Sequence, residues 1–298
     1  MRPPTQPAPE PPAALSAGAR DRRFGAHTAR ALAPWTYTAK GEDCVFSGLV
    51  GEGRGRGGSP CVIVADGASN LTTSSGALAV GGGAAAARLA CATLRHELHR
   101  GLHRHRNGSS RRPQSLEGTL HSLLHHFGEV EATLARHNAT GHCPGATTLL
   151  CALLLPLGAQ RRLYWVYGYL GDGELVIISP SRSLSGWPCE SWLLTPHSLG
   201  DRPLTLPRPP AMARFAPVVG ALPYAPGDVL YAASDGIGYL QRHLAQTRKL
   251  TFGQYLWQVG CAAGAGGLPT ALPDLRAGLG SAPPTLYDDA SVAAIWTI

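Results

Sequence analysis

Three short acidic motifs, each placed at the end or start of an apolar run, stand out in this sequence. They are VIVADGAS at 62–69, LYAASDGI at 230–237 and LYDDASVAAIW at 286–296. In each motif a β-prone stretch places an Asp beside a Gly or a second Asp, so that a sheet can gather the carboxylates in one place. Carboxylate oxygens are the ligands that Mg²⁺ and Mn²⁺ prefer in proteins. The motifs therefore predict a site for hard divalent cations.

Two such cations bridged by one carboxylate lower the pKa of a water between them and clamp both oxygens of a phosphoryl displacement. Asp66 is the candidate bridge, because Gly67 after it lets the backbone carbonyl approach a cation without a side chain in the way. Asp-Gly pairs are common in turns, so turn chemistry is the alternative for Asp66, Asp172, Asp235 and Asp288 taken singly. Their order, each attached to an apolar run, favours the cation site.

The elements expected around these motifs are mostly strands. Strands are predicted at 44–51, 61–67, 147–155, 161–171, 174–180, 229–234 and 290–298, with weaker candidates at 191–195 and 216–222. Helices are predicted in the Ala-rich segment 74–98, at 116–137 and around 252–259, where apolar residues recur with helical spacing. Paired rather than single helices between the strands favour a layered α+β fold over a doubly wound parallel sheet.

The glycines at 81–83 lower the helix propensity by about 1 kcal/mol each, which suggests that the helix backbone packs closely on a sheet. Neither this stretch nor EGRGRGG at 52–58 has the GxxxxGK[ST] pattern or a GxGxxG motif that opens a helix after a strand. Walker and Rossmann phosphate loops are therefore excluded.

Composition predicts one large folded domain after a tail. Residues 1–33 are rich in Pro, Ala and Arg and are expected to be disordered. Residues 34–298 would form the domain, interrupted by a Pro-rich excursion at about 181–226 and a Gly/Ala/Pro-rich loop that ends near 284. The sequence has no uninterrupted apolar run of about 18 residues and no apolar segment of a secretory signal at its start. We therefore expect a cytoplasmic protein with no membrane association.

The seven cysteines form no CxxC pair and are expected to be structural thiols. The net charge of +7 is concentrated in residues 1–32 and between Arg95 and Arg112, where six Arg face one Glu. We expect a solvated loop there, and an acidic docking partner is the alternative. Nucleic acid is not expected as a partner, because the stretch lacks stacking aromatics. His121 and His125 could share a helix face, but no HExxH pattern supports zinc.

With these motifs, the chain resembles the metal-dependent PP2C, or PPM, serine/threonine protein phosphatases. The short motifs are most similar to those of the compact bacterial branch of this family. The matching segments are GEDCVF (41–46), VADGAS (64–69), GATTLLCALL (145–154), YLGDGELVI (169–177), YAASDGI (231–237) and DDASVAAI (288–295). The resemblance implies a four-layer αββα sandwich, in which two antiparallel sheets are flanked by helices and a dinuclear site lies in the cleft at one end.

The resemblance also implies a mechanism. Asp66 would bridge two Mn²⁺ or Mg²⁺ ions, Gly67 would offer its carbonyl oxygen, and Asp235 and Asp288 would be further ligands. A hydroxide between the ions would attack the phosphorus of a phosphoserine or phosphothreonine in line, without a covalent phosphoenzyme.

Other positions match the outer parts of such a site. Glu42 and Asp43 match the acidic pair that holds metal-bound waters, and Asp172 matches the position linked to a third, looser metal. Asp289 stands where the family often has Asn. Segment 181–226 would correspond to the flap beside the cleft, a candidate substrate selector.

Two departures concern the substrate. The family commonly has an Arg four residues before the Glu of the acidic pair to hold phosphate, but this position is Thr38. Lys40 and Arg30 are the remaining candidates. The residue after the first Asp-Gly is a His in eukaryotic members and a proposed general acid, but here it is Ala68. Protonation of the leaving group would then fall to a metal-bound water.

The predicted function is therefore a metal-dependent protein serine/threonine phosphatase that acts on phosphorylated proteins and opposes a kinase. One alternative is a catalytically weak or inactive domain of the same fold that binds phosphoproteins or a partner, motivated by Thr38 and Ala68. Another is a hydrolase of small phosphoesters. Retention of the core carboxylates favours an enzyme, because an inactive site does not need to concentrate negative charge.

Overall fold

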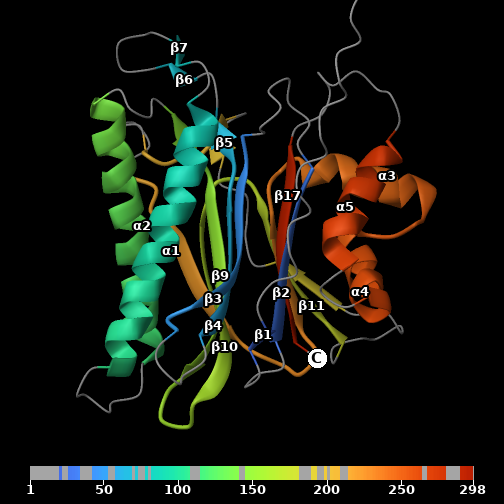
Figure 1. Cartoon of the computed structure of the whole chain (residues 1–298), viewed down its shortest axis with the longest axis horizontal. Coiled ribbons are helices and arrows are strands. Elements are labelled where there is room, and N and C mark those ends of the chain that lie inside the picture. Colours follow the sequence, from blue (N-terminus) through green and yellow to red (C-terminus); the bar gives the residue numbers. More distant parts are fainter. Residues whose placement is uncertain are drawn as a thin grey trace, which may run out of the picture.

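Two antiparallel sheets lie face to face between two layers of helices in this computed structural model (Figure 1). The structure describes residues 20–21, 26–33, 42–52, 58–68, 71–72, 78–79, 82–107, 115–140, 145–180, 189–192, 198–199, 202–208, 214–263, 267–279 and 289–297. The arrangement is the four-layer αββα sandwich expected from the sequence, and that prediction is confirmed.

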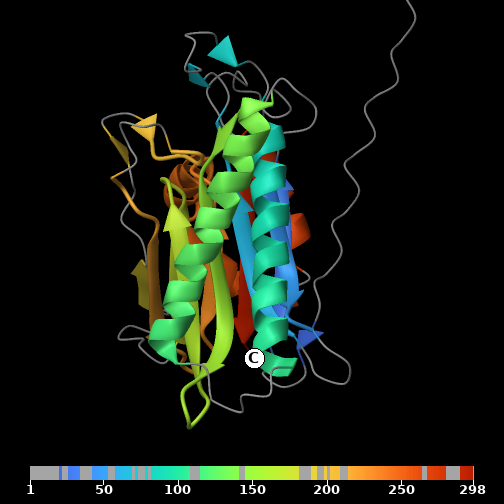
Figure 2. The same cartoon turned by 90° about the vertical axis from the view of Figure 1, so that its left-hand side faces the viewer.

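The first sheet, sheet I, has five strands. In spatial order they are β15 (Val218–Pro223), β10 (Arg162–Leu170), β9 (Leu149–Leu157), β4 (Ser59–Ala65) and β3 (Cys44–Val50). Helices α1 (Gly83–Asn107) and α2 (Leu116–Ala139) lie side by side along its outer face (Figures 1 and 2).

The second sheet, sheet II, has six strands. In spatial order they are β1 (Arg20–Asp21), β2 (Ala26–Ala33), β17 (Ala290–Thr297), β16 (Val229–Ala233), β11 (Glu174–Ser179) and β12 (Cys189–Trp192). Helices α3 (Ile237–Thr247), α4 (Phe252–Ala263) and α5 (Leu268–Ala277) cover its outer face (Figure 1). None of the described helices combines the length and apolarity that a membrane span needs.

Short two-stranded pairs complete the description. They are β5 (Gly67–Ala68) with β8 (Ala146–Thr147), β6 (Leu71–Thr72) with β7 (Leu78–Ala79), and β13 (Ser198–Leu199) with β14 (Arg202–Pro203).

The central strands are apolar on both faces because each face is covered. In β9, residues such as Cys151 and Leu153 pack under α1 and α2. Residues at the alternating positions, such as Leu150 and Leu154, face the other sheet. Strand side chains alternate between faces, so a continuous apolar run serves two layers at once. Sheet II divides its side chains between the inter-sheet layer and a third layer beneath α3 to α5 in the same way.

The sequence-based assignment was wrong in four places. Strand β2 lies in the segment expected to be disordered, and pairs with β17 from Ala26 opposite Thr297 to Ala33 opposite Ala290. Helix α1 begins at Gly83, not at 74, and continues to Asn107 through the stretch expected to be a loop. Helix α3 was not predicted, and α5 lies in the segment expected to be a loop.

In each of these places, contacts in the folded protein outweigh the local composition of the chain. Strand β2 is selected by a partner at the other end of the chain, which local composition does not reveal. In α1 the buried Leu98 and Leu102 extend the apolar stripe, while side chains such as His96 and Arg100 on the other faces reach water. In α5 burial of Leu272 and Leu275 under sheet II outweighs the cost of Pro273 within the helix.

The two sheets are joined by a buried carboxylate, that of Asp228, which lies just before β16. It accepts hydrogen bonds from Trp165 Nε1 in sheet I at 3.0 Å and from Ser179 Oγ in sheet II at 2.7 Å. The backbone N–H of Ala225 donates to it as well, at 2.9 Å. Three donors therefore satisfy a charge that burial would otherwise penalise.

We expect Asp228→Ala to lower the free energy of unfolding by about 2–5 kcal/mol, because the substitution leaves three buried donors without an acceptor. Urea denaturation measures the change. Asp274→Ala, which removes an exposed carboxylate on α5, should change stability by no more than about 0.5 kcal/mol. Equal stability of both variants would contradict a structural role for Asp228.

Candidate metal centre

The acidic residues predicted to act together lie at one end of the two sheets. Asp43 precedes β3 and Asp66 follows β4, while Ser234 follows β16 and Asp289 precedes β17. Because neighbouring strands are antiparallel, the end of one strand meets the start of the next. This end lies at the top of Figure 1, where β5 is labelled.

The carboxyl group of Asp43 is at the centre of this cluster. Its Oδ2 accepts a hydrogen bond from Ser234 Oγ at 2.7 Å, while its Oδ1 is buried and has no donor among the described residues. Burial raises the pKa of Asp43 to about 7, and the nearby charge of Asp289 adds to the rise. Ser291, Asp66 and Ser234 beside the carboxyl group oppose it.

Ser234 positions Asp43 because its hydroxyl both donates and accepts a hydrogen bond. The backbone N–H of Ser291 donates to Ser234 Oγ at 2.9 Å, and Ser234 N donates to the carbonyl of Ser291 at 3.0 Å. The hydroxyl donates to Asp43 Oδ2 at 2.7 Å, and the carbonyl oxygen of Asp289 is a second, longer acceptor at 3.3 Å. Ser291 Oγ lies beside the same carboxyl group but makes no hydrogen bond within the described structure.

Asp289 fixes the backbone of the acidic pair. It is buried, and its Oδ2 accepts a hydrogen bond from the backbone N–H of Glu42 at 2.7 Å. A Cβ at Gly236 would lie 1.9 Å from the carbonyl oxygen of Asp289. The Gly after Asp235 is therefore required by packing, since any other residue would push the two motifs apart.

The backbone of Asp66 is fixed by the GATTLL segment. Its carbonyl oxygen accepts hydrogen bonds from Thr148 N at 2.9 Å and from Thr147 Oγ1 at 2.7 Å. Its N–H donates to Thr148 Oγ1 at 3.3 Å. Thr147 also exchanges two backbone hydrogen bonds with Leu206, so part of the Pro-rich segment supports the strand that holds Asp66.

The glycines at the start of α1 permit close contact with this region, as the sequence predicted. A Cβ at Gly67 would lie 2.4 Å from the carbonyl carbon of Gly83, and a Cβ at Gly145 would lie 2.3 Å from that of Gly82. The first turn of α1 therefore lies against the Asp66–Gly67 segment. The positive end of the helix dipole favours negative charge there.

Asp172 lies beside the same cluster. A Cβ at Gly171, which has a φ of +125°, would lie 2.5 Å from Thr148 Cβ, and a Cβ at Gly173 would lie 2.6 Å from the carbonyl oxygen of Ala233. The GDG segment crosses from β10 in sheet I to β11 in sheet II. Asp172 therefore does not lie in a hairpin turn between two paired strands.

The remaining predicted residues are placed differently. Asp235 directly follows Ser234 and is exposed, and Glu42 is half-buried. Asp288, Thr38 and Lys40 lie outside the described residues, and the structure does not describe the side chain of Arg30, which lies in β2. Within the described ranges no three His, Cys, Asp or Glu side chains form a ready-made metal-binding group. The roles of Asp66, Gly67, Asp235 and Asp288 as ligands stay predictions.

The residues present nevertheless fit a divalent cation. A carboxylate oxygen buried without a donor is costly, and Asp43 Oδ1 is such an atom beside two further carboxylates. A hard cation favours an all-oxygen donor set of this kind and would offset the burial, and the nearby charge of Asp289, that raise the pKa of Asp43.

Sequence reasoning missed the polar residues that orient the acidic ones. Ser234 and Ser291 stand next to Asp235 and near Asp289 inside the recognised motifs, and Thr147 and Thr148 stand in GATTLL. A small hydroxyl residue within two positions of Asp235 and of Asp289 is the signal that could have found Ser234 and Ser291.

No family model matches the sequence, and no curated protein does. Solved structures do match. The serine/threonine phosphatase of S. agalactiae is 14% identical over 92% of this chain and 100% of its own, with a TM-score of 0.56. The PstP/Ppp phosphatase of Mycobacterium tuberculosis is 16% identical over 91% of this chain and 98% of its own, with a TM-score of 0.55.

A further match is the catalytic domain of the PstP phosphatase in complex with two manganese ions. It is 13% identical over 91% of this chain and 97% of its own, with a TM-score of 0.56. At such identities the likeness concerns the fold. The chain therefore has the fold of the bacterial PP2C, or PPM, serine/threonine phosphatases, which confirms the resemblance at that level.

We expect Asp43→Asn to stabilise the metal-free protein at pH 8 by about 1–3 kcal/mol and to have little effect at pH 4. The folded state raises the pKa of Asp43 from 3.8 to about 7. The folded protein therefore binds a proton that the unfolded chain releases, and stability falls as pH rises from about 4 to 7. Removing the carboxyl group removes this loss. Urea denaturation at several pH values measures it, with Asp274→Asn as the exposed control. A constant difference between the variants across this pH range would contradict the assignment.

Proposed function

We propose that this protein is a metal-dependent protein serine/threonine phosphatase. The observation that carries the proposal is the carboxyl cluster of the half-buried Asp43 and Asp66 and the buried Asp289, at the end of a PPM-type sandwich where acidic motifs lie. Clustered buried carboxylates are unfavourable unless something compensates them. Function lives in the site rather than in the fold, and this cluster is a feature of the site.

The residues that would hold two Mn²⁺ or Mg²⁺ ions are Asp66, Asp235 and Asp288, with the carbonyl of Gly67, and Asp172 at a third position. When bound, such ions lower the pKa of water towards neutrality and offset negative charge on a phosphoryl group. Glu42 and Asp43 would orient water beside them.

Several residues of the chain would prepare the site for this task. Ser234 donates a hydrogen bond to one oxygen of Asp43 and so limits the rotation of its carboxyl group. Thr147 and Thr148 donate hydrogen bonds to the carbonyl oxygen of Asp66, so its side-chain oxygens remain available as ligands. Ligand atoms that are fixed before the substrate arrives reduce the rearrangement of the site that the reaction needs.

The leaving group would take its proton from water. Ala68 lies in β5 opposite Ala146 of β8, and a methyl group at this position offers no proton donor. Its small size leaves room for solvent beside Asp66. We propose phosphorylated proteins as substrates and a serine/threonine kinase as the opposing activity, supported by the protein phosphatases that share the fold.

The purified protein should hydrolyse a phosphothreonine peptide with Mn²⁺ present and lose that activity in EDTA. Asp66→Asn and Asp235→Asn should each lower kcat by more than about a hundredfold, because each removes a carboxylate from the cation site. Release of phosphate measures the rate, and titration calorimetry measures Mn²⁺ binding separately. Asp274→Asn on α5 is the matched control and should change neither quantity.

The outcomes separate the three functions. Mn²⁺ binding with phosphopeptide binding but no turnover would support a binding domain. A higher kcat/KM for p-nitrophenyl phosphate than for phosphopeptides would support a small-phosphoester hydrolase. Failure to bind Mn²⁺ at all would exclude both enzymatic functions.

Ser234→Ala should weaken Mn²⁺ binding by about 10- to 100-fold, because Asp43 loses the donor that orients it. Ser234→Thr keeps the hydroxyl and should restore most of the affinity, whereas Asp274→Asn removes an exposed carboxylate on α5 and should change affinity little. Calorimetry measures all three. Equal affinities for the Ser234→Ala variant and the unmodified protein would show that Asp43 needs no such support.

A further inference from the structure

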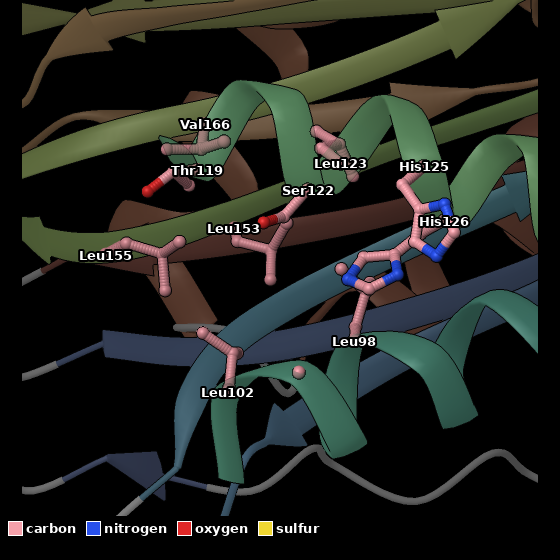
Figure 3. A pocket seen from close by; sticks show the side chains of 11 residues that line it. Leu98, Leu102, Thr119, Ser122, Leu123, His125, His126, Leu153, Leu155 and Val166 are labelled. Carbon is pink, nitrogen blue, oxygen red and sulfur yellow. The ribbon is translucent and has the colours of Figure 1, made fainter. Parts of the chain in front are cut away.

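Helix α2 is a fixed support on the outer side of sheet I. Its buried apolar side chains pack against the sheet over about three turns, and they are Leu123, Phe127, Val130 and Leu134. Leu123 also lines a small cavity of about 100 Å³ beside α1 (Figure 3). Because apolar contacts hold the helix, polar side chains at its other positions can anchor segments that lie outside the sheets.

The segment 204–208 is such a segment, because it precedes β15 and forms no strand. Leu204 and Leu206 are buried. An isolated antiparallel bridge joins Leu206 to Thr147 of β8, and the N–H of each residue donates to the carbonyl oxygen of the other, at 2.7 and 2.9 Å. A Cβ at Gly171 would lie 3.3 Å from the carbonyl oxygen of Leu204. The segment therefore contacts two of the places where acidic motifs are held.

Arg208 joins this segment to α2 through Glu131. Its Nε donates to Glu131 Oε1 at 2.8 Å, its Nη2 donates to Oε2 at 2.5 Å, and its backbone N–H donates to Oε1 at 3.0 Å. The Nη1 of the same guanidinium donates to the carbonyl oxygen of Phe215 at 2.6 Å. Two parallel bonds between a guanidinium and a carboxylate fix the geometry of the pair. Arg208 therefore connects α2 to two parts of the chain before β15.

The ion pair is largely shielded from water, because its two side chains are only 20% and 21% exposed. Burial alone would raise the pKa of Glu131, but the hydrogen bonds and the charge of Arg208 outweigh burial and lower that pKa. The carboxylate is therefore ionised near pH 7. Exposed ion pairs contribute little to stability, whereas a shielded pair with two parallel bonds holds its partners in one arrangement.

A second side chain of α2 holds the other half of the bridge. Asn138 lies seven residues, or about two turns, after Glu131 and therefore on the same side of the helix. Its Nδ2 donates to the carbonyl oxygen of Gly145 at 3.0 Å, and the N–H of Gly145 donates to its Oδ1 at 3.4 Å. Gly145 stands two positions before Thr147. Helix α2 therefore anchors the chain on both sides of the bridge between Thr147 and Leu206.

The bridge is linked directly to Asp66. Thr147 Oγ1 donates to the carbonyl oxygen of Asp66 at 2.7 Å, and Thr148 N donates to the same oxygen at 2.9 Å. Without Leu206 the N–H of Thr147 would lose its acceptor, and Asp66 would lose a fixed support. Contiguous hydrogen bonds of this kind carry energetic coupling between distant residues.

We infer that Arg208 is a positioning residue of the candidate metal centre. Its ion pair with Glu131 holds segment 204–208 against Thr147 and thereby keeps the carboxylate of Asp66 where it can bind a cation. The inference rests on the proposed function, in which Asp66 is a metal ligand. Arg208 itself touches neither the cation nor the substrate in this role.

Two other roles for Arg208 lead to different expectations. Arg208 could hold the substrate phosphate in place of the Arg that Thr38 replaces, but its Nε, Nη1 and Nη2 each already donate to a protein oxygen. A phosphate would have to displace Glu131. Alternatively, the ion pair could stabilise the fold without affecting the metal centre. The first role predicts a change in KM, and the second predicts no change in the affinity of the folded protein for Mn²⁺.

Amide hydrogen exchange in the absence of divalent metal tests the link between Arg208 and the bridge. Arg208→Gln should speed exchange at the amides of Thr147 and Leu206 by at least about tenfold, because the bridge opens more often. Exchange at Leu153, in the middle of β9, reports the stability of the sheet and should change less. Arg136→Gln removes an exposed cation of α2 that bonds only to its own helix and should change none of these rates.

Titration calorimetry with Mn²⁺ tests the consequence for the metal centre. Arg208→Gln and Glu131→Gln should each weaken binding by about tenfold at unchanged stoichiometry. The double variant should bind no more weakly than either single variant, because both residues act through one contact. Arg208→Lys keeps the charge without the two parallel bonds and should restore little. The matched controls Arg136→Gln and Glu129→Gln should leave the affinity unchanged.

Kinetics at saturating Mn²⁺ separate positioning from substrate binding. Most of the kcat of Arg208→Gln should return, and its KM for a phosphothreonine peptide should equal that of the unmodified protein, because Arg208 does not touch the substrate. A raised KM would instead make Arg208 a phosphate ligand and overturn the inference.

The remaining outcomes distinguish the inference from the proposed function. Unchanged exchange at Thr147 and Leu206, or an unmodified protein that binds Mn²⁺ no more tightly than Arg208→Gln and Glu131→Gln, would overturn the inference alone. A lower stoichiometry at unchanged affinity would show that the ion pair only stabilises the fold. An unmodified protein that binds no Mn²⁺ would refute the proposed function and the inference together. Circular dichroism verifies folding, and Glu131→Gln tests the same contact if Arg208→Gln does not fold.

Discussion

The burial of carboxyl groups away from water at one end of the sandwich is the constraint around which the rest of this structure is arranged. Asp43 has its pKa raised from 3.8 to about 7, which corresponds to about 4 kcal/mol against its ionised form. Each fully buried Leu or Val contributes about 1.5–3 kcal/mol. Three apolar layers filled with such side chains therefore offset the free-energy cost of keeping this carboxyl group away from water.

Glycine backbones make the cluster geometrically possible. The carboxylates come from segments far apart in the chain, and these segments meet where Gly67 faces Gly83 and where Gly236 faces Asp289. A single methyl group at either point would collide with backbone, which cannot move aside as a side chain can. The glycines thus decide how close the acidic motifs come, and the hydroxyl of Ser234 then decides how Asp43 is oriented.

Different parts of the same sandwich have different chemistry. The end with the acidic motifs concentrates negative charge, and Asp228, at the start of β16, carries a carboxylate that three donors satisfy. The two acids differ in their donors, because Asp228 has three, whereas Oδ1 of Asp43 has none among the described residues. The face formed by α1 and α2 has a cavity with a mainly apolar lining and, beside it, a groove in which Arg100 and Arg136 lie with Glu97 and Glu129.

The sequence by itself determined a layered α+β fold and most central strands, because apolar periodicity is a local property, while the resemblance of its short motifs to the PPM phosphatases implied the αββα sandwich and the end of the sheets at which Asp43, Asp66 and Asp172 lie. It left open what depends on contacts between distant residues. Ser234 bonds to Asp43 across 191 positions and Glu42 to Asp289 across 247, and β2 finds β17 at the opposite terminus. Only the tertiary structure decided these pairings, since each partner is one of many polar or small residues until folding brings it within hydrogen-bonding distance.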